Sequence, residues 1–73
     1  MPLYKIGIYN QTVRNYVRSG EDIPDHIDIS EDFEFVMYFE REAQNIQVLD
    51  SKVSKEFPKK VGYVVDYVRE IQE

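Results

Sequence analysis

The chain has 73 residues and a formal net charge of −5, so it forms one domain at most, near the lower size limit for an unaided hydrophobic core. It has no cysteine, which excludes disulfide frameworks, thiolate metal sites and a cysteine nucleophile. The sequence has neither a signal-peptide pattern nor an apolar stretch of about 20 residues, so we expect a soluble, cytoplasmic protein.

The charges are laid out unevenly along the chain. Residues 1–20 carry three bases and no acid, residues 21–50 carry ten acids and one base, and residues 51–73 are nearly balanced. Nucleic-acid binding depends on clustered Lys and Arg side chains, because neutralised phosphates release counterions. Arg14 and Arg18 are too few to form such a surface, so we expect no nucleic-acid partner.

The first part of the chain predicts a strand followed by a short helix. Residues 4–9 alternate at a period of two, which is typical of a strand. Over residues 12–19 the apolar side chains recur at helical spacing, Asn10 offers an N-cap, and Gly20 stands at the expected stop position. A second hairpin strand over the same residues is the alternative, since Thr, Val and Tyr also suit strands.

The middle of the chain predicts an acidic loop and then the clearest strand. Residues 21–32 combine Pro24 with crowded like charges, which indicates a loop, and three interspersed isoleucines should pin it to the domain. Residues 33–40 predict a strand, because large apolar side chains fill one of its faces at a period of two: Phe33, Phe35, Met37 and Phe39.

The last part predicts a long helix and a final strand. Apolar side chains recur at helical spacing over residues 42–57, and Pro58 marks the end. We expect Leu49 of this helix to share one core with Phe35. Residues 61–68 fit a strand by alternation, while the Val and Ile positions over residues 61–71 fit a helix equally well. Their β-branched and aromatic content favours the strand.

These elements predict a two-layer α+β domain, in which the long helix covers one face of a three-stranded sheet. If the second and third strands pair directly, they do so as parallel neighbours with a right-handed crossover. The predicted helix-facing side holds Tyr4, Ile6, Ile8, Phe33, Phe35, Met37, Phe39, Val61 and Val65. The other side holds Gly7, Tyr9, Val36, Tyr38, Gly62, Val64 and Val68. It is more apolar than an open face should be, so either the short helix and the loop cover it or it is an interface.

The acidic segment supplies the first candidate binding residues: Asp22, Asp25, Asp28 and Asp32. Calcium needs oxygen donors that converge at a sharp turn, but Phe33 stands where an EF-hand loop beginning at Asp28 requires glycine. We therefore expect these acids to contact a basic protein partner, with no metal site and no cofactor. His26 lies among them and could respond to pH, but it has no partner in a nucleophile motif.

Pro2 is the one candidate catalytic residue. An N-terminal proline that opens a strand in a short α+β chain resembles the small tautomerases, which use a free prolyl amine as a general base. The resemblance implies that Pro2, after removal of Met1, acts as the base of a small oligomeric enzyme. It covers only the first residues, and in that family the first strand leads directly into a long helix, whereas here a short segment and an acidic loop follow.

Three hypotheses of function result. The preferred one is a non-enzymatic interaction module, adaptor-like or inhibitor-like, that docks a basic protein surface through its acidic segment. The second is a structural or assembly subunit that forms a homodimer through Tyr9, Tyr38 and Val64, because tyrosine rings are enriched in interface cores. The third is the enzyme that uses Pro2.

Overall fold

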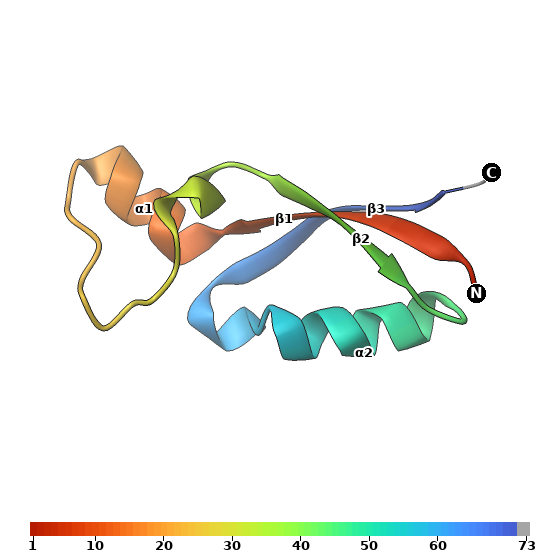
Figure 1. Ribbon diagram of the computed structural model, residues 1–73. Helices are drawn as coiled ribbons and strands as arrows, with labels where there is room; N and C mark the ends of the chain where they lie inside the picture. Colours follow the sequence, from red (N-terminus) through yellow and green to blue (C-terminus); the bar gives the residue numbers. More distant parts are fainter. Residues whose placement is uncertain (72–73) are drawn as a thin grey trace.

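One helix packed on a three-stranded antiparallel sheet forms the body of the fold (Figure 1). The structure, a computed structural model, describes residues 1–71. Its elements, with η for a short 3-10 helix, are β1 (Leu3–Asn10), α1 (Gln11–Ser19), η1 (Glu31–Glu34), β2 (Met37–Glu42), α2 (Ile46–Glu56), η2 (Lys59–Val61) and β3 (Tyr63–Ile71). The predicted α+β architecture, with three strands, one long helix and one short helix, is confirmed.

The first strand of the chain is the central strand of the sheet. The strand order is β2-β1-β3, and β1 pairs antiparallel with both neighbours. β2 and β3 therefore run parallel to each other with β1 between them, and the direct pairing considered from the sequence does not occur. β1 takes this place because its side chains can be buried on one face, whereas β2 and β3 carry more charged residues, which suit sheet edges.

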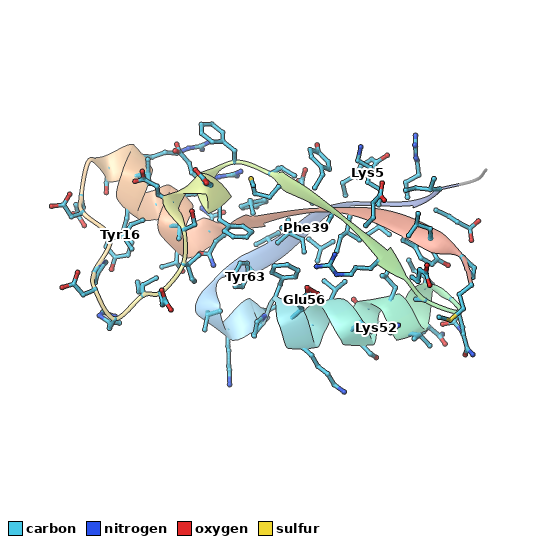
Figure 2. The ribbon with its side chains drawn as sticks, in the orientation of Figure 1. Lys5, Tyr16, Phe39, Lys52, Glu56 and Tyr63 are labelled. Atoms are coloured by element: carbon cyan, nitrogen blue, oxygen red, sulfur yellow. The ribbon has the colours of Figure 1, made fainter. Side chains whose placement is uncertain are left out.

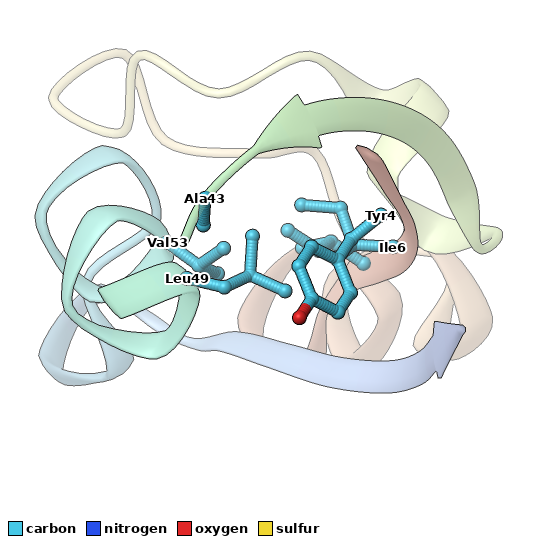
Figure 3. Close-up of a cluster of buried hydrophobic side chains, with 6 residues drawn as sticks. Tyr4, Ile6, Ala43, Leu49 and Val53 are labelled. Carbon is cyan, nitrogen blue, oxygen red and sulfur yellow. The ribbon is translucent and has the colours of Figure 1, made fainter. Parts of the chain in front are cut away.

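The main core lies between β1 and α2. Leu49 and Val53 reach from α2 toward Tyr4 and Ile6 of β1 (Figure 3). The buried cluster consists of Tyr4, Ile6, Ile8, Ala43, Leu49 and Val53, and half-buried Phe39, Val48, Phe57 and Tyr63 pack against it. Each fully buried aliphatic side chain of this kind contributes about 1.5–3 kcal/mol to folding.

The second strand begins later than residue 33. Ser30 starts a 3-10 turn instead, since its hydroxyl accepts a hydrogen bond from the Asp32 N–H at 3.3 Å and its carbonyl accepts one from the Phe33 N–H at 3.1 Å. Phe33 still packs its ring against the aromatic side chains of the core. Phe35 is 65% exposed, so the expectation that it shares a core with Leu49 is wrong.

The short helix α1 forms as predicted and extends the molecule lengthwise. The Asn10 side chain caps it by accepting a hydrogen bond from the Val13 N–H at 3.0 Å, and Gly20 ends it with a left-handed φ of 76°. Figure 1 shows α1 and the connection after it beyond one end of the sheet. The molecule consequently measures 42 × 20 × 13 Å.

The long helix α2 begins four residues later and ends one residue earlier than predicted. Asn45 starts it, because the Asn45 side chain accepts a hydrogen bond from the Val48 N–H at 2.9 Å. Phe57 closes it immediately before Pro58. At its first position, Ile46 is 53% exposed, although its spacing from Leu49 matches that of an apolar helix face.

The last segment is a strand, but it starts at Tyr63 rather than Val61. Val61 lies in η2 and is 42% exposed, so its predicted place on the helix-facing side of the sheet is wrong. Gly62 then turns the chain with a φ of 105°, and its carbonyl accepts a hydrogen bond from the Gln11 N–H at 2.7 Å. The start of β3 is thereby fixed to the junction of β1 and α1.

A bulge in β3 changes the face on which its later side chains lie. The register pairs Gly7 with Tyr67 and Ile6 with Val68, while Asp66 is an extra residue without a partner on β1. Val68 therefore faces α2, and its predicted place on the opposite side is wrong. Tyr67 lies on the side opposite α2, next to Gly7.

Candidate functional site

The face of the sheet opposite α2 is the main candidate site. We call it the tyrosine face and define it by Tyr9, Val36, Tyr38, Val64 and Tyr67. Figure 2 shows Lys5 on this side of the sheet, whereas Phe39 and Tyr63 lie on the α2 side. α2 covers only the other side of the sheet (Figure 1), and of these five side chains Tyr38 is exposed while the other four are half-buried.

The tyrosine face is built over Gly7. A Cβ atom on Gly7 would lie 2.8 Å from Cγ1 of Val36, 3.0 Å from Cε1 of Tyr38 and 3.1 Å from Cβ of Tyr67. The rings of Tyr38 and Tyr67 meet edge to face across it, with centroids 6.0 Å apart and an interplanar angle of 78°. Glycine is thus required for the close approach of the two tyrosines. Tyr38 remains 57% exposed, so one side of the pair is available to a partner.

Two cationic side chains lie over tyrosine rings of this face, one over Tyr38 and one over Tyr9. Nζ of Lys5 lies 5.2 Å from the centroid of the Tyr38 ring, and Cζ of Arg14 lies 3.7 Å from that of the Tyr9 ring. Arg14 is also fixed by a hydrogen bond from its Nε to the carbonyl oxygen of Glu34, at 2.9 Å. Such cation–π contacts orient the tyrosine rings and give the face a polar margin.

The four predicted aspartates are all exposed in or beside the connection between α1 and β2: Asp22, Asp25, Asp28 and Asp32. Three isoleucines of this connection are half-buried: Ile23, Ile27 and Ile29. Asp32 lies within η1, where its carbonyl accepts a hydrogen bond from the Phe35 N–H at 3.2 Å. Of the four, Asp32 is therefore the one that adjoins the exposed Phe35 and the start of β2.

The structure brings together the three apolar residues predicted for an interface. Tyr9 and Val64 are direct partners in the β1–β3 register, and Tyr38 is the partner of Gly7 on β2. Sequence reasoning missed Tyr67, because the bulge before it reverses the alternation of β3. Asp22 and Asp28 each line a surface hollow. Among residues 1–71, neither of these two hollows is lined by a residue of the tyrosine face.

The ionisable groups with shifted pKa values lie on the α2 side. The hydrogen bond from Arg41 lowers the pKa of Glu56 and raises that of Arg41, while partial burial of each group opposes its shift. Nε of Arg41 lies 3.0 Å from Oε2 of Glu56, which joins β2 to α2. Burial raises the pKa of Tyr63. These groups belong to the contact between helix and sheet, so we assign them a structural role.

The remaining candidates have ordinary surroundings. His26 is exposed and borders a shallow hollow with Asp28 and Lys60. The Pro2 carbonyl accepts a hydrogen bond from the Ala43 N–H at 3.1 Å, which fixes the backbone before β1. Within residues 1–71, no three His, Asp or Glu side chains are grouped so that they could hold a metal ion. No helix in this part of the chain is long and apolar enough to cross a membrane.

Comparison with known proteins gives no relative for this chain. No protein-family model, no curated protein and no solved structure matches it. Its function is therefore argued from its own surfaces.

Proposed function

We propose that this chain is a non-enzymatic protein-interaction module that docks a basic protein surface with its acidic segment and the adjoining tyrosine face. The observation that carries the proposal is the position of Phe35. This ring is 65% exposed and stands between the acidic η1 and the start of β2, which bears Tyr38. Exposed aromatic side chains next to a charged margin are typical of a docking surface.

The two parts of this surface contribute differently to binding. Phe35 and Tyr38 supply apolar area, and burying large aromatic rings gives the strongest contacts in protein interfaces. The aspartates around residues 22–32 supply a negative field, which speeds encounter with a basic surface and is screened by salt. Loss of the acids should therefore slow association, while loss of an aromatic ring should speed dissociation.

The experiment begins with partners captured from host lysate on the immobilised chain, and it measures their binding kinetics with purified proteins. Replacing all four aspartates by Asn should lower the association rate several-fold, and added salt should lower it for the wild type more than for this variant. Tyr38→Glu should raise the dissociation rate. Val61→Glu is the control, because Val61 is also exposed but lies in η2 and not on the tyrosine face. Unchanged kinetics in both the Asn variant and Tyr38→Glu would exclude the proposal.

A second candidate function, a homodimeric structural subunit, is favoured by the exposed side of the tyrosine pair. Tyr38 is 57% exposed and meets Tyr67 edge to face over Gly7, and tyrosine rings are enriched in interface cores. A two-fold dimer would close the tyrosine face against its own copy. Light scattering over a concentration series tests this. A mass that stays at 8.7 kDa at high concentration contradicts the dimer, and a doubled mass that Tyr38→Glu halves supports it.

A further inference from the structure

An apolar groove runs between α2 and β3, on the side of the sheet away from the tyrosine face. It has a volume of about 280 Å³, and its apolar lining consists of Ile6, Ile46, Leu49, Val53, Val65 and Val68. Ile6, Leu49 and Val53 form its buried floor. Its walls are open to solvent, since Ile46 is 53% exposed and Val68 is 42% exposed. The groove thus joins the hydrophobic core to the surface beside an edge strand.

The groove is open because α2 is anchored to the opposite edge of the sheet. Arg41 of β2 forms an ion pair with Glu56 of α2. Nζ of Lys52 donates a hydrogen bond to the carbonyl oxygen of Glu42 at 2.9 Å. Figure 2 shows Lys52 and Glu56 on α2, on the same side of the sheet as Phe39. These tethers hold α2 toward β2, so the apolar side chains of β3 lack a cover on their α2 side.

The groove also lies beside an unpaired strand edge. Within residues 1–71, β3 pairs only with β1, so its outer edge has no strand partner. The bulge at Asp66 interrupts this edge, but Tyr67–Ile71 continues in regular register with β1. An extended peptide can add to such an edge through backbone hydrogen bonds and place alternate side chains in the neighbouring groove.

The charges around the groove favour a basic occupant. Asp50 lines it from α2, Glu70 lies on the same side of the sheet by its register with Tyr4, and Asp66 is exposed at the bulge. Two bases lie nearby: Lys59 borders an adjoining hollow that shares Asp50 with the groove, and Arg69 of β3 lies on the opposite side of the sheet by its register with Lys5. A second copy of this chain would bring the same three acids against their own kind, and like charges in contact oppose association.

We propose that the groove between α2 and β3 binds an extended segment of another protein, in which every second residue faces the α2 side of the sheet and these residues include both apolar side chains and Lys or Arg. The segment adds to β3 along Tyr67–Ile71 as a fourth strand. Its apolar side chains cover Val68 and Ile46, and its basic side chains face Asp50 and Glu70. This site lies on the α2 side and at the outer edge of β3, and it shares only the backbone of Tyr67 with the tyrosine face, so it does not depend on the function proposed above.

The test selects ligands for the intact chain from a displayed library of random nine-residue peptides, the length of β3. In the selected peptides, apolar residues and Lys or Arg should recur two positions apart, on one face of the extended chain. A synthetic copy of the most enriched peptide should shift the backbone amide resonances of Tyr67–Ile71 and of α2. Its affinity should fall with salt, and about tenfold with Val68→Lys. Val61→Lys is the matched control, because the two valines have the same exposed fraction of 42%.

Several results would overturn the inference. The selected peptides could lack basic residues, or shift the backbone resonances of Tyr9 and Tyr38 instead of those of Val68–Ile71. Methylation of one of the two sets of alternate peptide nitrogens should abolish binding, because only that set donates to β3, and equal binding of both methylated peptides would exclude strand addition. If the chain alone shows a doubled mass that Val68→Lys halves and Val61→Lys does not, the groove binds a second copy rather than a basic peptide. Both variants replace exposed valines, and circular dichroism checks that each is folded.

Discussion

Replacing Gly7 by alanine tests how the tyrosine face is assembled. In a strand interior, alanine is normally better than glycine by about 0.5–1 kcal/mol, because glycine loses more backbone freedom on folding. At Gly7 the added Cβ would lie only 2.8 Å from Val36 Cγ1 and 3.0 Å from Tyr38 Cε1. Overpacking of this kind costs about 1–3 kcal/mol. We therefore expect Gly7→Ala to lower the free energy of unfolding by a net amount of about 0.5–2 kcal/mol.

A double-mutant cycle in urea isolates the steric origin of this cost. Val36→Ala removes the atom closest to the added Cβ. In that background, Gly7→Ala should therefore lower the free energy of unfolding by at least about 0.5 kcal/mol less than it does in the wild type. Gly20→Ala is the control, because Gly20 has a φ of 76° and nothing within 4 Å of an added Cβ. Its cost comes from the backbone and should not depend on Val36. A Gly7→Ala variant that is more stable than the wild type, or equally destabilised in both backgrounds, would refute the packing described here.

Three further predictions concern the core, the ion pair and the turn before β3. Leu49→Ala should lower the free energy of unfolding by about 2–5 kcal/mol, because Leu49 is buried in the core. Phe35→Ala should change it by under about 1 kcal/mol, because Phe35 is exposed. Equal losses of stability for the two variants in urea denaturation would contradict the assigned core. Because the pKa of Glu56 is lowered on folding, its pair with Arg41 stabilises the chain above the unfolded pKa and is lost as the pH falls through the folded value. Glu56→Gln should remove an acid-dependent loss of about 0.2–1 kcal/mol below about pH 4, and an unchanged pH profile would contradict this. Gly62→Ala should lower the melting temperature, because Gly62 has a φ of 105° and an added Cβ would collide with neighbouring side chains. An unaltered melting temperature would contradict the turn geometry.

Local patterns in the sequence were sufficient for the elements and for the fold class. Asn10 and Gly20 delimit α1, and Pro58 ends α2, because caps and helix stops depend on the residues beside them. The alternation in β1 and the burial of Leu49 also followed directly from spacing. Of the candidate site, the sequence placed Tyr9 and Tyr38 on the side of the sheet that α2 does not cover.

Only the tertiary structure decided the order of the strands, the true bounds of β2 and the faces of β3. The order β2-β1-β3 depends on which edges hydrogen-bond over long sequence separations, and alternation alone carries no information about that. Phe35 continues the apolar alternation, yet the turn begun by Ser30 leaves it exposed. A single extra residue, Asp66, reversed the faces of Tyr67 and Val68, since side chains alternate at a period of two. The tyrosine pair over Gly7 and the groove beside α2 both depend on that bulge, so neither could be read from the pattern of residues alone.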